Sequence, residues 1–535
     1  MPLLQKFTSD KELLTIKEAS VWASRFLERD IEESNILYLV QYGRLKKYSE
    51  HNALYVTLED LESYYADRKN SRESKWKEKL GDDLNWALSF DHLREKDTTK
   101  HVHRLHPYKG KFIPQLVEYF IDAHTDNFKL ETYFREGDII LDPFCGSGTT
   151  PIQASEMGIH AVGIDISRFN CMIADVKLSR ANLQELNSEI RKVQKVLAEF
   201  EVENHIPQFD VELSARLSKF NDLYFPSPDF KYRVAQGEID EETYGFSKEK
   251  EFLETYRGLV NAYGIKLKQD KNSSFLDKWY LESVRAEIDC VFEQIRKIED
   301  IDLKKILAVI LSRTIRSCRA TTHSDLATLK EPQIDTYYCW KHKKICKPLF
   351  SIKGWFNRYA QDTVVRLRAF NAIRKDCTQV ILAGDSRSVD IFKEIRKKLP
   401  DFSPLLEQQK IKGIFTSPPY VGQIDYHEQH AYAYDLFGFE RNDDREIGPL
   451  FKGQGIAARQ SYVDGIVEVL LNCRKFLAED FDIFMVANDK YNLYPTIAGR
   501  SGLQIVNQFK RPVLNRTERD KSPYSEIIFH LKAVR

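Results

Sequence analysis

The stretch from Asp138 to Ser167, DIILDPFCGSGTTPIQASEMGIHAVGIDIS, decides the fold class. Its first apolar run, DIILDPF, predicts a strand that enters a turn with two glycines. TTPIQASEM then predicts a helix that ends at Gly158, and HAVGIDIS predicts a second strand. A strand, a glycine turn, a helix and a second strand in this order indicate a βαβ unit with parallel strands.

The same alternation stops and later resumes. Residues from about 180 to 375 are mostly helical in pattern and rich in charged and aromatic residues. The segments TQVILAGDS, IKGIFTSPPY, FDIFMVAND and SEIIFHLKA then predict further strands. An interrupted alternation of this kind predicts an α/β protein with one doubly wound sheet that carries a large, mainly helical insertion.

Special residues follow four of the predicted strands. Gly146 and Gly148 allow a backbone to approach a ligand closely, and the next helix offers free N–H groups at its start. Asp165 and Asp385 end the next two strands, where each could cap the strand or hold a ligand. The fourth strand ends in residues 417–420, SPPY, whose two prolines continue neither a strand nor a helix. Ligands bind outside the carboxyl ends of such strands, so we expect a ligand site here.

These loops resemble the motifs of the DNA amino-methyltransferases, a family that uses S-adenosyl-L-methionine. DPFCGSGTT resembles the cofactor motif of the family, TSPPY its catalytic motif, and HPYKGKFIPQL an additional cofactor motif. The resemblance covers roughly residues 100–180 and 375–535 and implies a Rossmann-like methyltransferase sheet. It implies that Asp165 binds the ribose and Asp385 the adenine of the cofactor. The other cofactor contacts that it implies are Lys109, Phe112, Asp142, Pro143, Phe144, Gly146, Gly148 and Thr149.

The chemistry of amine methylation explains what a rigid SPPY tip would do. The exocyclic amine of a base is a poor nucleophile, because its lone pair is conjugated with the ring. Acceptors on Ser417 and on the Pro418 carbonyl, held at fixed angles by Pro418 and Pro419, would turn this lone pair outward. Tyr420 would stack on a target base that has been flipped out of the double helix. Ser417, Pro418, Pro419 and Tyr420 are therefore the candidate catalytic residues.

The residue before the two prolines bears on the target base. Members of the family usually have serine here when they methylate cytosine N4, and aspartate or asparagine when they methylate adenine N6. Ser417 thus implies cytosine N4, with adenine N6 as the alternative. Enzymes that methylate a cytosine carbon carry a cysteine after a proline in this loop, whereas this loop has Ser417 instead.

Residues 1–70 predict a separate small unit. A T-x-x-E capping box from Thr15 to Glu18 starts one helix, and Gly43 ends a second. RLKKY and NALYVTLEDLESYY follow as a β-wing and a closing helix, a pattern that resembles the winged helix-turn-helix of excisionase-like DNA-binding proteins. The alternative is a small protein-interaction domain. The resemblance implies DNA contacts from Ser34, Asn35, Arg44, Lys46 and Lys47.

Further candidate DNA contacts lie elsewhere in the chain. Arg313, Arg316 and Arg319 recur every third residue of the insertion, and arginine suits phosphates and guanine edges. The alternative is a solvated helix face. Arg516 and Arg519 stand in a basic loop that resembles the last motif of the family. We therefore expect residues 1–70 to bind DNA, 71–100 to be a linker, 101–180 and 376–535 to form the methyltransferase domain, and 181–375 to be a candidate target-recognition insertion.

The segment CWKHKKIC raises the question of a metal. Its Cys339, His342 and Cys346 match no common zinc spacing, and the sequence shows no obvious second ligand pair. Packed thiols on a basic loop are the favoured interpretation, so no metal is expected.

The amino-acid composition limits the classes of function and location that remain. The 80 acidic and 80 basic residues exclude a uniformly basic coat for nucleic acid. The eight scattered cysteines suit reduced thiols in a cytoplasm, and neither a signal peptide nor a membrane span is expected. We therefore expect a cytoplasmic, site-specific methyltransferase of double-stranded DNA, with a cognate restriction endonuclease as a candidate partner. The alternatives are an RNA amino-methyltransferase and a non-enzymatic DNA-binding regulator.

Overall fold

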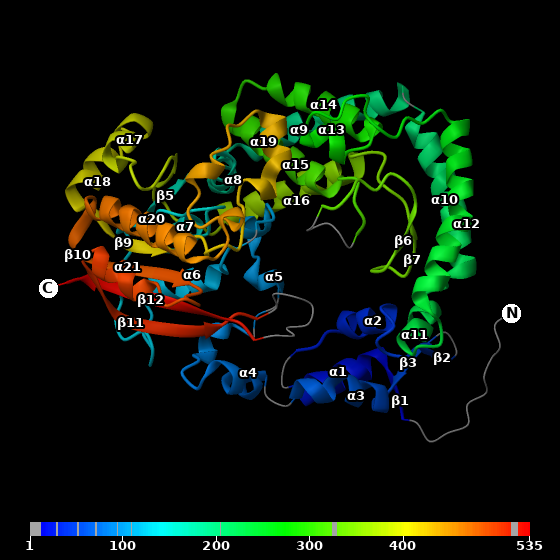
Figure 1. The fold of residues 1–535 in the computed structure, drawn as a ribbon, viewed down its shortest axis with the longest axis horizontal. Coiled ribbons are helices and arrows are strands. Elements are labelled where there is room, and N and C mark those ends of the chain that lie inside the picture. Colours follow the sequence, from blue (N-terminus) through cyan, green and yellow to red (C-terminus); the bar gives the residue numbers. More distant parts are fainter. Residues whose placement is uncertain are drawn as a thin grey trace.

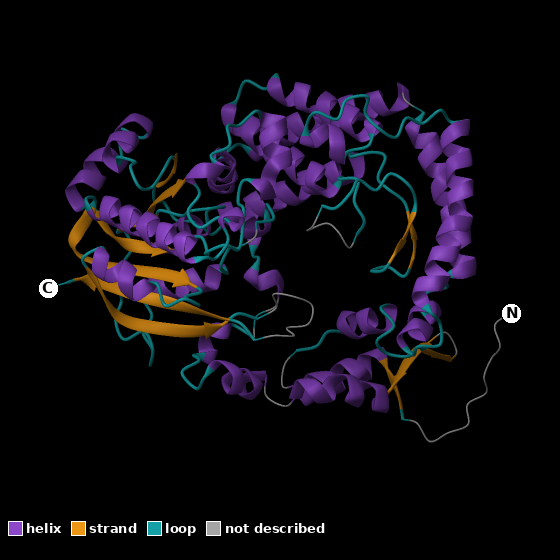
Figure 2. Ribbon diagram, viewed as in Figure 1, coloured by secondary structure: helices purple, strands orange, loops and turns teal. Residues whose placement is uncertain are grey.

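The computed structural model describes residues 12–27, 30–50, 53–69, 72–91, 93, 95–108, 110–203, 205–323, 329–514 and 523–534. Within these ranges, every helix is too short or too polar to cross a lipid bilayer. Strands occur in three places, a large sheet, a small N-terminal sheet and a short hairpin, and helices make up most of the rest (Figure 2).

The large sheet has seven strands in the order β11-β12-β10-β9-β4-β5-β8. The five strands β8, β5, β4, β9 and β10 are parallel, and β12 is antiparallel to both β10 and β11. The predicted α/β sheet is therefore present and mostly parallel. The strand bounds are β4 (Ile139–Asp142), β5 (His160–Asp165), β8 (Gln379–Ala383), β9 (Ile411–Thr416), β10 (Leu477–Ala487), β11 (Leu503–Pro512) and β12 (Ser525–Ala533).

Helices cover both faces of this sheet. In β4, Ile139 and Leu141 join the apolar cluster on one face, whereas Ile140 joins the cluster on the other, as the alternation of side chains along a strand requires. The first face is covered by α17 (Ile391–Lys398), α18 (Ser403–Gln409), α20 (Ile456–Arg474) and α21 (Tyr494–Arg500). The other face carries α6 (Pro114–Ile121), α7 (Thr149–Met157) and α8 (Arg168–Leu178).

The insertion between β5 and β8 is mainly helical, as predicted. It extends across the top of the view in Figure 1 and down along α10 and α12. Its helices are α9 (Leu183–Glu203), α10 (Ile206–Tyr224), α11 (Asp229–Ala235), α12 (Glu241–Ala262), α13 (Phe275–Trp279), α14 (Glu282–Arg296), α15 (Ile301–Ser317) and α16 (Lys353–Asn371). A hairpin of β6 (Tyr337–Cys339) and β7 (Lys344–Cys346) lies between α15 and α16.

The N-terminal unit consists of three helices and a small three-stranded antiparallel sheet around its own small core. The predicted capping box is confirmed, because Thr15 N donates to Glu18 Oε2 and Glu18 N donates to Thr15 Oγ1. The unit contacts α11, where Lys231 Nζ donates to the Gln41 carbonyl over 3.1 Å. Its elements are β1 (Leu13–Thr15), α1 (Ile16–Leu27), α2 (Glu33–Gln41), β2 (Tyr48–Glu50), β3 (Ala53–Thr57) and α3 (Leu58–Lys69).

The segment expected to be a linker packs against the sheet edge. Trp76 and Leu88 are buried. Asn85 N donates to the Lys510 carbonyl of β11 over 2.7 Å, and Arg511 Nε donates to the Leu88 carbonyl over 3.1 Å. This part of the chain therefore continues the β11 edge of the sheet. It contains α4 (Arg72–Leu80), the 3₁₀ helix η1 (Trp86–Ser89) and α5 (Glu95–Thr98).

The remaining elements of the described residues are short helices. They are η2 (His101–Arg104), η3 (Glu428–His430), α19 (Ala431–Phe437), η4 (Asp443–Arg445) and η5 (Leu450–Lys452).

Candidate active site

A pocket lies at the carboxyl ends of β4, β5, β8 and β9, where the sequence predicts a ligand site. It contains about 870 Å³ of space, including the part open to solvent, which is within the usual range for small-molecule sites. Four loops that are distant in sequence meet here, because parallel strands bring their carboxyl ends to one edge. The predicted site residues that line it are Phe112, Asp142, Pro143, Phe144, Gly146, Thr149, Asp165, Asp385, Ser417 and Pro419.

The glycine loop after β4 is held from two sides. Gly148, with φ at +85°, is the residue before α7 and does not itself line the pocket. Gly146 N donates to Asp165 Oδ2 over 2.8 Å, and Lys177 Nζ donates to the Ser147 carbonyl over 2.7 Å. Lys177 is fully buried, and this burial lowers the pKa of its ammonium group well below the ordinary value. The loop is thus fixed by β5 and α8 before any ligand binds.

Asp142 joins the ends of β4 and β9. Its Oδ1 accepts hydrogen bonds from Thr416 Oγ1 over 2.6 Å and from Phe144 N over 3.2 Å. Burial raises the pKa of Asp142 to about 6, against the opposing effect of these hydrogen bonds. This carboxyl group therefore changes charge just below neutral pH.

Asp165 and Asp385 already accept hydrogen bonds from the protein. Asp165 Oδ1 accepts from Ser167 N and from Asn170 Nδ2, and its Oδ2 accepts from Gly146 N. Asp385 is paired with Arg387, whose Nη2 lies 2.6 Å from Oδ2. Burial opposes this pairing, but the hydrogen bonds from Arg387 hold the pKa of Asp385 below its ordinary value. A carboxylate offers about four acceptor positions, so Asp165, which accepts three hydrogen bonds, retains room for one more donor. Asp385 already accepts two hydrogen bonds from Arg387 on each oxygen.

The SPPY tip places Ser417 in the pocket, where the hydrogen of its hydroxyl group is already used in a hydrogen bond within the protein. Ser417 Oγ donates to the Val486 carbonyl of β10 over 3.0 Å, so the lone pairs of the hydroxyl oxygen are left to accept. Pro419 lines the pocket, whereas Pro418 and Tyr420 do not. Tyr420 OH donates to Glu526 Oε1 of β12 over 2.8 Å, which fixes the tip to the neighbouring strands. The tip is thus rigid, but Tyr420 differs from its expected position as a stacking surface.

Other aromatic side chains line the pocket, and the sequence did not single them out. Tyr108 and Tyr426 have nearly parallel rings with centroids 6.2 Å apart. Tyr108 belongs to HPYKGKFIPQL, in which only Lys109 and Phe112 were expected to contact a ligand. Tyr426 comes six residues after the tip, in a segment whose only signal is its richness in tyrosine, histidine and acids.

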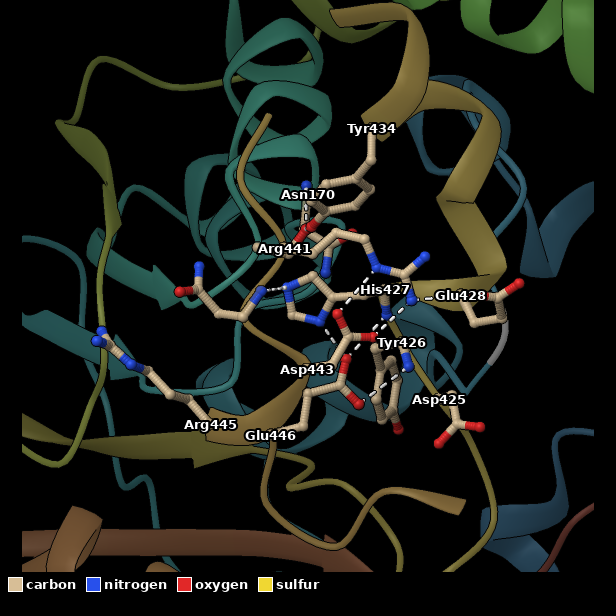
Figure 3. Close-up of polar contacts among 12 residues, drawn as sticks. Asn170, Asp425, Tyr426, His427, Glu428, Tyr434, Arg441, Asp443, Arg445 and Glu446 are labelled. Carbon is tan, nitrogen blue, oxygen red and sulfur yellow. Dashed lines mark hydrogen bonds and ion pairs between the residues drawn. The ribbon is translucent and has the colours of Figure 1, made fainter. Parts of the chain in front are cut away.

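A polar network behind Tyr426 closes one wall of the pocket (Figure 3). His427 Nδ1 contacts Glu446 Oε1, and the backbone N–H groups of Tyr426 and His427 donate to the same carboxylate. Asn442 N approaches His427 Nε2 at 3.4 Å, which favours the tautomer with the hydrogen on Nδ1. The segment after the SPPY tip is thereby fixed to the loop 442–446.

The candidate DNA contacts of the N-terminal unit have different environments. Arg44 and Lys47 are exposed, whereas Lys46 lies with its Nζ 5.6 Å from the centre of the Tyr232 ring. Asn35 Oδ1 accepts from Glu32 N at the start of α2, and Ser34 is exposed beside it. Arg44 and Lys47 are therefore the exposed basic residues of this set.

The three arginines of the insertion do not share one exposed face. Arg313 is buried, donates to Asp362 Oδ2 over 2.7 Å and stacks on Tyr359, so the expected DNA contact is corrected to a structural ion pair. Arg316 and Arg319 are half-buried. Three further expected contacts lie outside the described residues, namely Lys109, Arg516 and Arg519.

Comparisons with known proteins agree with the motifs. A family described as DNA methylase matches residues 16–175. The type II methyltransferase M.MjaII of Methanocaldococcus jannaschii is 49% identical over 529 residues, which cover 98% of this chain and 97% of the relative. The type II methyltransferase M.BsoBI of Geobacillus stearothermophilus is 31% identical over 355 residues, 65% of this chain and 54% of the relative. The match to M.MjaII extends nearly from end to end, so it includes the N-terminal unit and the insertion as well as the sheet.

Proposed function

The chain belongs to the type II DNA methyltransferases, and from that premise we propose that it methylates the exocyclic N4 amine of cytosine within one DNA sequence. Its general activity is that of a site-specific DNA amino-methyltransferase, and its cofactor is S-adenosyl-L-methionine. The target atom, the route of the base and the DNA-contacting surface are the parts that we propose.

The pocket fits this cofactor. When it is bound, S-adenosyl-L-methionine supplies a methyl group on a positively charged sulfonium. Asp142 and Phe144, with the glycine loop, offer a negative charge and an aromatic ring on the methionine side. Asp165 Oδ2 keeps an acceptor position for the ribose, whereas Asp385 would accept from the adenine amine in place of one of its hydrogen bonds from Arg387. Phe112 would add apolar contact.

One observation carries the proposed chemistry, namely the hydrogen bond from Ser417 Oγ to the Val486 carbonyl. Because the only hydrogen of this hydroxyl is used, its oxygen can face a substrate amine only as an acceptor. Accepting a hydrogen bond from the amine turns the nitrogen lone pair away from the ring plane and towards the methyl donor. The carbonyl of Pro418 is the second proposed acceptor, and Pro418 and Pro419 fix both groups.

The preference for cytosine follows from the side chain before the two prolines. Serine presents one neutral acceptor, whereas asparagine or aspartate would present a planar one, as is usual for adenine N6. We propose that the base leaves the double helix to reach Ser417, since the amine inside the stack is out of reach. Tyr420 is then a positioning residue that acts through Glu526, and the rings of Tyr108 and Tyr426 are the proposed aromatic surfaces for the base.

We propose that the DNA lies on the inner side of the arc formed by the sheet, the insertion and the N-terminal unit. Figure 1 places α2 and the hairpin β6–β7 on this inner side, towards which the carboxyl ends of the parallel strands point. The helix pair α1–α2 with the hairpin β2–β3 would act as a winged helix-turn-helix, with Arg44 and Lys47 on phosphates. A cognate restriction endonuclease is a proposed partner, as the type II class of the relatives suggests.

Mass spectrometry of nucleosides tests the target atom. DNA from cells that express the protein should contain N4-methylcytosine above the level of cells with an empty vector. Excess N6-methyladenine without N4-methylcytosine would contradict the cytosine assignment.

Two serine variants test the role of Ser417. Ser417→Ala should lose at least about a hundredfold in turnover at saturating cofactor, as is typical when one preorganised polar group is removed, while cofactor affinity is kept. Ser386→Ala is the matched control, because Ser386 Oγ also lines the pocket and donates to a backbone carbonyl, that of Pro143, over 2.6 Å. It should weaken cofactor binding and leave turnover at saturation close to normal. Normal turnover in Ser417→Ala would remove Ser417 from the mechanism.

A further inference from the structure

Four potential metal ligands converge at the hairpin β6–β7, away from the methyltransferase pocket. Cys339 ends β6, Cys346 ends β7, and His342 lies in the turn between the two strands. His323 joins them from the segment after α15, sixteen residues before Cys339. The ligand atoms of all four residues lie within 4.8 Å of one another. The fourth member, His323, is the ligand that the sequence spacing does not reveal.

The distances among these atoms match a tetrahedral ion. Cys339 Sγ lies 3.5 Å from Nδ1 of His323 and 3.5 Å from Nδ1 of His342, and Cys346 Sγ lies 3.7 Å from Nδ1 of His342. A tetrahedral Zn²⁺ with bonds of about 2.3 Å to sulfur and about 2.0–2.1 Å to nitrogen separates a sulfur ligand from a nitrogen ligand by about 3.6 Å. All three separations are within about 0.2 Å of this value.

We propose that His323, Cys339, His342 and Cys346 form a closed, structural Zn²⁺ site. Two thiolates and two neutral imidazoles complete four-coordination and balance the charge of the ion, with no position left for substrate. This proposal differs from the interpretation that the sequence favoured, in which the two cysteines are packed thiols without a metal. A disulfide between the two cysteines is the competing arrangement, but it would not account for the convergence of both imidazoles on the sulfur atoms.

An ion would add to the contacts that hold this short hairpin, whose Tyr338 and Ile345 pack into the large helical core. Each of its strands has three residues, and its own apolar cluster consists of Tyr337, Cys339 and Cys346. A two-stranded hairpin of this size is not stable alone. Outer contacts hold it at one side, where Asn221 pairs with both backbone groups of Ile345. An ion would fix the opposite side and tie the hairpin to the end of α15.

One contact must change when the ion binds. Tyr337 OH lies 2.8 Å from His323 Nδ1, and this nitrogen has a single lone pair that either accepts a hydrogen bond or binds a metal. Removal of the Tyr337 hydroxyl should therefore leave the zinc content unchanged or raise the affinity. The Tyr337→Phe variant therefore tests whether the metal needs only the four proposed ligands and not the neighbouring tyrosine hydroxyl.

Metal analysis of the full chain tests the proposal. The protein is purified without a metal-affinity column and without chelator, and its metals are measured by mass spectrometry. We expect about one zinc per chain in the unaltered protein and in Tyr337→Phe, as a closed four-ligand site requires. Cys290→Ser, which changes a half-buried cysteine of α14 outside the cluster, should also retain zinc. Cys339→Ser and His342→Ala should lose most of it.

A second measurement covers variants that fold poorly. Chelator-treated, unaltered protein is titrated with Co²⁺, which should give the strong visible bands of a tetrahedral thiolate site, and the bands should be reversed by Zn²⁺. Cofactor binding, measured in the same samples, reports whether the methyltransferase domain is still folded. Unaltered protein without stoichiometric zinc, a Cys339–Cys346 disulfide in peptide mapping, or full zinc content in Cys339→Ser would each overturn the proposal. None of these readouts depends on methylation, so the proposed function stands or falls separately.

Discussion

At the scale of single residues, the Asp142 carboxyl determines how the pocket responds to pH. Its pKa of about 6 means that it is mostly neutral at pH 5 and mostly ionised at pH 7. The ionised form attracts a positively charged ligand and the neutral form does not. Between pH 7 and pH 5 the ionised fraction falls about tenfold. We therefore expect affinity for S-adenosyl-L-methionine to fall by up to about tenfold over this interval, as measured by calorimetry.

The Asp142→Asn variant is the control for this effect. It keeps the shape of the side chain but cannot ionise, so its affinity should be low and nearly constant from pH 5 to pH 7. If both proteins show the same pH profile, another group controls binding.

Residues of the pocket were predictable where they stand at strand ends. Asp142, Asp165, Asp385 and Ser417 converge because parallel strands align their carboxyl ends, which sequence order alone implies. Residues that reach the pocket through loop packing were not predictable. Tyr426 and Glu446 are brought together by a hydrogen bond between positions twenty residues apart, and no local pattern encodes this contact.

At the scale of elements, the start of α7 depends on Gly148. Its φ of +85° disfavours any other residue, and a Cβ atom here would lie 2.9 Å from the Cβ of Ala174 in α8. Gly148→Ala should therefore destabilise the protein by about 1–3 kcal/mol, from the left-handed backbone and from overpacking. The midpoint of urea unfolding, followed by circular dichroism, measures the change.

A second glycine provides the comparison. Gly258 lies on the exposed side of α12 and a Cβ atom would meet nothing within 4 Å, so Gly258→Ala should be neutral or stabilising by up to about 1 kcal/mol. Equal destabilisation in both variants would show that the close approach to Ala174 does not cause the loss of stability in Gly148→Ala.

Elements with strong periodicity were predicted, and weakly patterned ones were not. Six strands of the large sheet follow from their apolar runs. The seventh, β11, was missed because it is an edge strand with exposed polar residues at several positions and an irregular register between Ile505 and Asn507. Arg313 shows the opposite error, since a basic residue on a predicted helix was assigned to DNA although Asp362 of α16 pairs with it inside the protein.

At the scale of the whole molecule, the N-terminal unit should contribute electrostatic affinity for DNA. The slope of log affinity against log salt becomes shallower by about 0.9 for each phosphate that the protein no longer neutralises. The double variant Arg44→Ala/Lys47→Ala should therefore lower the slope by about 1.8 and weaken binding to all duplexes alike. Binding to labelled duplex at several salt concentrations measures both effects.

The matched control removes the same charge from the far end of the molecule. Lys393 and Lys397 lie on α17, which Figure 1 shows at the opposite side from the N-terminal unit. The Lys393→Ala/Lys397→Ala variant should keep the salt slope of the unaltered protein. A slope that changes equally in both double variants would argue against a specific DNA surface on the N-terminal unit.

The sequence did not predict how the N-terminal unit, the insertion and the sheet pack against one another. The parallel βαβ unit was predictable from the sequence, but the docking of α11 against the N-terminal unit depends on single contacts such as Lys231 with the Gln41 carbonyl. The docking of residues 80–88 onto β11 was hidden for the same reason, because residues 71–100 as a whole are rich in charged residues and were expected to form a linker.

The position of the insertion also has a consequence for the protein during its synthesis on the ribosome. Ile140 of β4 pairs with Gly413 of β9, about 270 residues later in the chain. At a synthesis rate of about 5–20 residues per second, the edge of β4 that pairs with β9 stays unpaired for on the order of tens of seconds during synthesis. An unpaired edge strand invites association with other chains during that time. The helical insertion is synthesised in this interval, before β9 emerges to complete the sheet.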